Sequence, residues 1–456
     1  MSAIGPDAPP GAGTGTGAGA AAGGAGQNGD LRRALGNMAA KAGSLVVERG
    51  AQLALLLGAG RMLGVVSFGR FSYASGVTAV LAFGTDLGLT LWTTRALARD
   101  PDPGFAARAL GTAFRLRVYA MVPYFVCLAA LAAISGPGEV RDILLPIGVA
   151  SLARVFLDHA RAVFRARERI GDEGKVNAVV ASLATGGGLA AVAISQRGLA
   201  ALAAGMMVGT LAGAVYGFVL LGRGYGPWTG RLDRALAPRM LREALPFWMA
   251  GILSLVYTRG DVVILRQLAG DAEVGAYRAA GQLFDVAKNF PTVVMTAMFP
   301  QLARHFRQAR ERLRRTERGV SGGLLLSGVL GAVVLATVVG LVAQRILGSD
   351  FARIVPVLRV LALALPLVFL NAALTSFLVA RDLGVLHMIF TGAMIPISAA
   401  CNLVFDRRQG ASGAAWSVLI AEVFLTLCCL LALRAARRRD ADFVAPGPEV
   451  SERPGR

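Results

Sequence analysis

The sequence predicts an all-α polytopic membrane protein, with about 12 transmembrane helices in two six-helix lobes. Three observations predict this fold class. Hydrophobic residues make up 55% of the 456 positions and charged residues 16%, and the mean hydropathy is +0.58. Apolar stretches of the length that a bilayer helix needs, about 20 residues, recur along the chain. The basic residues behind the net charge of +19 stand in short blocks between these stretches, which is typical of a topology signal rather than of nucleic-acid binding.

Each predicted span is an apolar stretch between charged or turn-forming residues. The spans are 36–59, 69–92, 110–134, 143–163, 175–195, 198–222, 245–267, 276–299, 320–345, 355–380, 385–404 and 411–434. Residues 1–30 are rich in Gly, Ala and Pro and cannot bury a core, so they are predicted to form a disordered tail that is not a signal peptide. Residues 440–456 are predicted to form a second polar tail.

Basic residues are concentrated in alternate loops. They fall mainly in the ranges Arg95–Arg117, Arg161–Lys175, Arg223–Arg242, Arg304–Arg318 and Arg434–Arg439. The count is roughly thirty basic residues on one side of the membrane and about ten on the other. The positive-inside rule therefore predicts that both termini lie in the cytoplasm, which requires an even number of spans.

The two halves of the chain resemble each other. Matching segments at a nearly constant offset are 69–74 with 275–280, 97–99 with 302–304, and 164–168 with 377–382. This offset predicts an N-terminal six-helix lobe over 31–225 and a C-terminal six-helix lobe over 226–439. Six spans in each lobe imply a parallel repeat.

Three predicted spans carry polar stripes at helical spacing. They are Lys41, Ser44, Glu48 and Gln52 with Arg49 beside them, Ser254, Thr258 and Asp261 with Tyr257 and Arg259, and Arg278, Gln282, Asp285, Asn289, Thr292 and Thr296 with Lys288. Charge inside a membrane costs a few kcal/mol per residue on insertion scales, so these faces are expected to line a watery cavity or one another. The alternative is that Glu48–Arg49, Arg259–Asp261 and Arg278–Asp285 are neutralising pairs that hold helices together, and both interpretations remain open.

No sequence motif indicates a cofactor, a metal or a catalytic group. Gly58, Gly60 and Gly64 are spaced as in a dinucleotide-binding loop, but they lie in an apolar span with no acidic residue at the usual distance. The three histidines have no ligand-spaced partners, and the four cysteines lie in apolar spans without metal-type spacing.

Several segments resemble bacterial polysaccharide flippases of the Wzx type, in the multidrug/oligosaccharidyl-lipid/polysaccharide exporter superfamily. They are Pro246–Ala250, Tyr257–Arg266, Val274–Ala280, Phe299-Pro300, Leu63-Gly64, Phe68–Phe71 and Gly410–Ala415. The resemblance covers nearly the whole chain as a pattern of small and apolar residues. It has two departures, because Arg266 stands where Gly is frequent and 65–68 is Val-Val-Ser-Phe where polar or acidic residues are common.

The resemblance implies a transporter, not an enzyme, in the bacterial cytoplasmic (inner) membrane. Its substrate would be a polyprenyl-pyrophosphate-linked oligosaccharide, moved from the inner to the outer leaflet by alternating access for lipopolysaccharide or exopolysaccharide export. Other expected partners are membrane lipids, H⁺ or Na⁺, and a polysaccharide polymerase and export proteins, and no nucleic acid is expected. Because Arg suits phosphate, the residues expected to bind the anionic head-group are Arg49, Arg259, Arg278 and Lys288. Glu48, Asp261 and Asp285 are expected to serve ion coupling or charge pairing.

Three other functions compete with this one. A multidrug or cation antiporter of the same superfamily would have mainly acidic residues in its cavity, whereas bases and acids are balanced in the stripes. A membrane-embedded glycosyltransferase or polymerase would have a large extracytoplasmic loop with carboxylates, and the longest loops here are predicted to be cytoplasmic and basic. A flippase for a peptidoglycan precursor usually has two further C-terminal helices, which this sequence lacks.

Overall fold

The computed structural model describes residues 18–100, 102–195, 198–225, 230–291, 294–295, 310–381 and 383–442. The described residues form helices joined by short turns, without a strand. The helices are α1 (Ala18–Gly84), α2 (Leu89–Arg99), α3 (Pro103–Ile134), α4 (Glu139–Ala166), α5 (Ile170–Ser195), α6 (Gly198–Tyr225), α7 (Leu236–Ala269), α8 (Asp271–Lys288), α10 (Arg310–Val334), α11 (Gly340–Leu347), α12 (Ile354–Ala380), α13 (Gly384–Gln409) and α14 (Ala411–Asp442).

The number of membrane crossings agrees with the prediction of about 12 spans. Nine candidate spans among the described residues are long and apolar enough to cross a membrane. The span at Gly43–Gly84 contains a break at Gly64 (φ 77°, ψ 172°) and therefore makes two crossings. Two further helices, α4 and α8, have 28 and 18 residues, and a larger share of their residues is charged than in any of the nine. With them, the described helices account for twelve crossings.

Two predicted spans differ from the structure. The eighth is predicted over 276–299, but α8 begins at Asp271 and ends at Lys288. The sequence predicts the second span over 69–92, but the helix ends at Gly84 and α2 begins at Leu89. Leu87 and Gly88 in the intervening turn have positive φ angles of 52° and 74°, which no helix can accommodate. Apolar residues continue through this turn, so hydropathy alone does not reveal the break.

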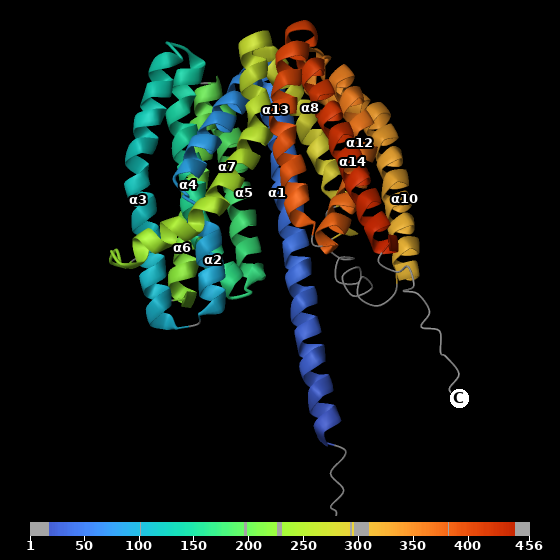
Figure 1. The fold of residues 1–456 in the computed structure, drawn as a ribbon. Helices are drawn as coiled ribbons and strands as arrows, with labels where there is room; N and C mark the ends of the chain where they lie inside the picture. The colour runs from blue at the N-terminus through green and yellow to red at the C-terminus, as the bar shows by residue number, and fades with distance from the viewer. Residues whose placement is uncertain are drawn as a thin grey trace, which may run out of the picture.

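Figure 1 shows α3, α4 and α6 on one side of the bundle and α10, α12 and α14 on the other, with α1 passing between them. The beginning of α1 and the end of α14 lie at the same end of the bundle (Figure 1). We call this the termini end, and the other the far end. The lobe boundary at 225/226 and the cytoplasmic position of the termini stay predictions.

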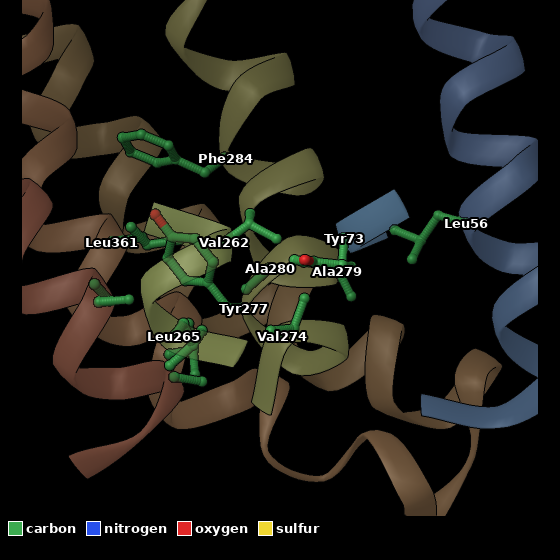
Figure 2. Close-up of a cluster of buried hydrophobic side chains, with 14 of the residues drawn as sticks. Leu56, Tyr73, Val262, Leu265, Val274, Tyr277, Ala279, Ala280, Phe284 and Leu361 are labelled. Carbon is green, nitrogen blue, oxygen red and sulfur yellow. The ribbon is translucent and has the colours of Figure 1, made fainter. Parts of the chain in front are cut away.

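The main apolar core joins the two sides of the bundle. Figure 2 shows part of it, where Tyr73 of α1 lies beside Val274, Ala279 and Ala280 of α8. Nearby, Tyr277 is 5% exposed. The helices that carry the predicted polar stripes are therefore fixed against one another by apolar contacts at the far end.

Arg117 lies in the protein interior near the turn between α1 and α2, although it was predicted to lie in a basic cytoplasmic loop; that prediction is wrong. It is a fully buried residue of α3. Its Nη2 atom donates to Asp86 Oδ1 at 2.7 Å and to Thr90 Oγ1 at 2.9 Å, and its Nη1 atom lies 3.1 Å from His159 Nδ1. The buried guanidinium therefore connects α3 and α4 to the turn between α1 and α2.

Candidate functional site

A cavity of about 460 Å³ lies between α1, α4, α5 and α6 on one side and α7 and α8 on the other. Its charged lining residues are Glu48, Arg49, Arg154, Asp158, Arg161, Arg259, Arg278 and Asp285. Five of the seven predicted site residues are among them, and only Lys288 and Asp261 are not. The stripes on α1 and α8 face this cavity, whereas on α7 only Arg259 beside the predicted stripe lines it, and Ser254 and Thr258 are exposed.

The cavity lies at mid-depth in the bundle. Arg259 is ten residues from the far end of α7 and Arg278 seven residues from the far end of α8. At 1.5 Å of rise per residue these positions lie roughly 10–15 Å from that end. Arg49 lies fifteen residues before the break at Gly64, or about 22 Å from it. Because a hydrocarbon core is about 30 Å thick, these positions fall within the depth of the membrane-spanning part of the helices.

The contribution of α4 to the cavity was not predicted from the sequence. Ser151, Arg154, Asp158 and Arg161 of this helix line the cavity, at spacings of three, four and three residues. Arg161 was assigned to a cytoplasmic loop, and that assignment is wrong because the helix continues to Ala166. The helical spacing was readable from the sequence, but the adjacent block of loop arginines concealed it.

Several lining charges are already paired. Asp158 accepts a hydrogen bond from Arg161 at 2.8 Å, and Arg49 donates to Gln52 Oε1 at 2.8 Å. Asp285 forms an ion pair with Lys288 at 2.7 Å. Lys288 is exposed at the end of α8, so it reaches the site through this carboxylate rather than by lining the cavity.

Three lining arginines have no such partner. Among the residues that the structure describes, no hydrogen bond or ion pair is formed by Arg154, Arg259 or Arg278. Arg259 lies within electrostatic range of Arg278 and Arg154, and also of the carboxylates of Asp261 and Asp285. Because none of the three arginines forms a hydrogen bond or ion pair with these carboxylates in the described structure, their guanidinium donors remain available to an anion.

The proposed neutralising pairs do not form within the described part of the chain. Asp261 accepts from the hydroxyl of Tyr277 at 2.5 Å and from the backbone N–H of Val262 at 2.7 Å, so it is not paired with Arg259. Arg49 and Asp285 also have the other partners given above. Charge pairing between these neighbours therefore does not explain the polar stripes.

A second polar cluster lies on α13, behind Asp261. Asp406 is 1% exposed and Asn402, one turn earlier, is 2% exposed. Both carboxylate oxygens of Asp406 and the Asn402 side-chain oxygen lack a hydrogen-bond partner among the described residues. Asp261 lies within electrostatic range of Asp406. Neither residue was predicted from the sequence, because Arg407 and Arg408 follow Asp406 directly and the predicted span 385–404 ends before it.

This chain matches a known protein family and shares its fold with solved membrane transporters. The model of the family described as "Polysaccharide biosynthesis protein" matches residues 35–306. A multidrug resistance MATE family transporter of the MOP superfamily, in an inward-facing conformation, has a TM-score of 0.71 at 12% identity, over 89% of this chain and 100% of that chain. No curated protein sequence matches the chain.

Two further structures share the fold. The lipid II flippase MurJ, in an inward closed conformation, has a TM-score of 0.67 at 12% identity, over 85% of this chain and 87% of that chain. A MOP superfamily transporter from Pyrococcus furiosus has a TM-score of 0.59 at 13% identity, over 89% of this chain and 94% of that chain. The reverse polarity of its binding pocket is described as suggesting a different function.

Proposed function

Because this chain belongs to the family of polysaccharide biosynthesis proteins, we propose that it moves a polyprenyl-pyrophosphate-linked oligosaccharide across the membrane by alternating access. Family and fold make it a multi-pass membrane transporter of flippase type. The proposal concerns the substrate, the direction from inner to outer leaflet, and the bacterial inner membrane as its location. A polysaccharide polymerase and export proteins are the proposed partners that would receive the product.

The observation that carries the proposal is the set of unpartnered arginines, Arg154, Arg259 and Arg278, in the membrane-spanning part of the helices. A pyrophosphate bearing sugars cannot cross hydrocarbon without compensating positive charge. Guanidinium groups bind phosphate oxygens through a planar fork of donors. Because Arg154 lies on α4 and the other two on α7 and α8, a single diphosphate would be bound from both sides of the cavity.

A cation or drug antiporter is the competing proposal, since such transporters share the fold. The charged lining argues against it, because five arginines outnumber three carboxylates and two of these carboxylates are paired. The Pyrococcus furiosus neighbour indicates that this fold does not fix the polarity of the pocket. We therefore favour an anionic substrate.

Reconstitution tests the substrate class. Purified protein in liposomes should accelerate the movement of a fluorescent polyprenyl-pyrophosphate-linked sugar between leaflets, measured by quenching from one side. A cationic dye of similar size should not be transported. Dye transport without movement of the lipid-linked sugar would replace this proposal by the antiporter. Protein-free liposomes and liposomes containing the Arg259→Glu variant are the controls.

The α13 cluster is proposed as the site of ion coupling. The unpartnered acceptors of Asp406 and Asn402, next to Asp261, suit H⁺ or Na⁺, because buried acceptors without donors are costly unless a cation satisfies them. Glu48 and Asp285 face the cavity and would instead position its arginines.

Removal of one carboxylate of the proposed ion-coupling site should make transport independent of the ion gradient. Asp406→Asn is expected to abolish the stimulation of sugar-lipid movement by an imposed Na⁺ or H⁺ gradient while leaving the movement without a gradient measurable. Asp158→Asn, at a carboxylate paired with Arg161, is the matched control and should keep the stimulation. Unchanged stimulation in both Asp406→Asn and Asp261→Asn would exclude this site.

A further inference from the structure

An ion-pair cluster joins four helices at the far end of the bundle. Asp271, the first residue of α8, accepts hydrogen bonds from Arg70 of α1 at 2.9 Å and from Arg266 of α7 at 2.7 Å. Arg70 also donates to Glu139, the first residue of α4, at 2.8 Å. The cluster therefore connects the helices on both sides of the cavity. Arg266, which departs from the Gly frequent in the resembling family, lies 4.1 Å above the ring of Tyr73.

The backbones of α1 and α8 touch directly beneath this cluster. A Cβ atom added to Gly69 would lie 2.9 Å from the amide nitrogen of Gly275 and closer still to the carbonyl oxygen of Asp271. One added to Gly275 would lie 2.9 Å from a side-chain carbon of Val65 and would overlap that residue's carbonyl oxygen. The two glycines that the sequence repeat matched thus allow a contact that no side chain could enter.

An apolar layer lies between this contact and the cavity. Phe68, Phe71, Tyr277 and Phe351 are at most 6% exposed, and the rings of Phe68 and Phe351 pack edge to face at 6.4 Å. Figure 2 shows Tyr277 and Val274 of α8 within the same cluster. The cavity lining begins at Phe71 on the second half of α1 and at Arg278 on α8, so this layer lies between the lining and the far end on these two helices.

The ion pairs of this cluster are more exposed than the buried pair of Arg117 and Asp86. The side chains of Arg70, Asp271 and Glu139 are 33%, 19% and 51% exposed. Water screens such pairs, so they contribute little net free energy and can be broken and re-formed. Gly64, six residues before Arg70, has a φ of 77° that favours glycine, and it offers a pivot for the second half of α1.

Glu273, two residues beyond Asp271, holds α8 to its own side of the bundle. It accepts from Arg353, which precedes α12, and from the backbone N–H of Ala411 at 2.8 Å, at the start of α14. Separation of α1 from α8 would leave these contacts intact. Asp271 therefore connects the two sides of the bundle, whereas Glu273 connects helices within one side.

We propose that Arg70, Asp271 and Glu139 form a releasable latch that keeps the cavity closed at the far end, and that its release opens the cavity on that side. This inference rests on the proposed transport function, because only a transporter needs to expose the cavity on both sides. The Gly69–Gly275 contact and the apolar layer make the closed state tight. The partly exposed ion pairs make it reversible.

The latch is tested by labelling from outside intact cells. In the full-length protein with its four cysteines replaced by serine, Ser75→Cys places a reporter just below the apolar layer. A membrane-impermeant maleimide should label it slowly. Asp271→Asn and Arg70→Glu are each expected to raise the labelling rate about fivefold or more. The first loses the ion pairs of Asp271 with Arg70 and Arg266, and the second loses those of Arg70 with Asp271 and Glu139. Arg70→Lys, which keeps the charge, should remain near the parent rate.

Two controls bracket the measurement. Glu173→Gln removes a 2.7 Å ion pair to Arg165 at the termini end and should not change the labelling of Ser75→Cys. Ser135→Cys, in the turn between α3 and α4 at the far end, should react in every background, which establishes orientation and membrane insertion. Unchanged labelling of Ser75→Cys in both latch variants, with Ser135→Cys reactive, would overturn the latch. An equal rise in the labelling rate of Ser75→Cys in the Glu173→Gln variant would also overturn the latch.

The labelling needs no glycan, so it separates the latch from the substrate proposal. A rise in labelling together with failure to move the lipid-linked sugar supports the latch and rejects the substrate. Movement of the sugar without any rise in labelling rejects the latch alone.

Discussion

Arg259→Glu is expected to abolish surface polysaccharide in a strain that lacks the native gene, while the protein remains in the membrane at its normal level. The substitution replaces an unpartnered cation in the membrane-spanning part of α7 by an anion facing the pyrophosphate. An unpaired charge in such a site costs several kcal/mol, and each ~1.4 kcal/mol changes binding tenfold. Arg259→Gln should reduce export at least about tenfold. Arg259→Lys should be mildest, because it keeps the charge and loses only the guanidinium fork.

The same order of effects is expected at Arg278 and Arg154, which share the unpartnered state. Arg242→Glu is the matched control, because Arg242 is an exposed arginine on the same helix as Arg259, near the termini end. It should leave export close to normal. Normal export by neutral and reversed variants at all three cavity arginines would exclude pyrophosphate binding there. A cation exporter would instead tolerate these changes and fail on loss of Glu48, Asp261 or Asp285.

The fold was largely predictable because its main determinants are local in sequence. Span length and hydropathy are properties of a single segment, and they locate the crossings without knowledge of the neighbours. The break between α1 and α2 is different, because it depends on the positive φ angles of Leu87 and Gly88. Nothing in the hydropathy of that stretch distinguishes a turn from a continuing helix.

The cavity was predictable where a polar stripe lay well inside an apolar span, as with Arg278 and Asp285 on α8. The cavity was not predictable where the polar stripe continued into a basic loop, as with Arg154 and Arg161 on α4. A one-dimensional reading places such charges in the aqueous phase, because the positive-inside rule counts every nearby arginine. Arg161 was therefore counted as a topology signal although it lines the cavity, and Arg154 and Asp158, inside the predicted span 143–163, were not recognised as part of the same polar face.

The hydrogen-bond and ion-pair partners of the charged side chains were the least predictable feature, because they depend on which helices pack together. Sequence neighbours such as Arg259 and Asp261 invite pairing, yet Asp261 bonds instead to Tyr277 on the next helix. The latch shows the same effect, since Arg70 and Asp271 are 201 residues apart. The matching glycines at 69 and 275 were noticed as a repeat, but their contact required the three-dimensional structure.

Loss of the buried guanidinium at Arg117 is expected to have the largest effect on folding. Arg117→Met leaves the carboxylate of Asp86 without its cation in the interior, where both side chains are at most 7% exposed. Removing one partner of such a pair destabilises a protein by ~3–5 kcal/mol, since an uncompensated charge remains buried. The measurement is thermal aggregation of the detergent-solubilised protein, followed by size-exclusion chromatography. The single variant should lose its monodisperse peak many degrees below the parent protein.

The double variant Arg117→Met with Asp86→Leu distinguishes a buried charge from lost packing. Joint apolar replacement of a buried pair is often neutral or stabilising, so the double variant should recover most of the lost thermal stability. Arg165→Met is the control for a partly exposed pair, because the Arg165 side chain is 43% exposed beside Glu173. Its effect should stay within ~0–1 kcal/mol. If Arg117→Met is as stable as the parent protein, the ion pair with Asp86 does not stabilise the fold. If the double variant is as unstable as Arg117→Met, the lost stability comes from packing against Thr90 and His159.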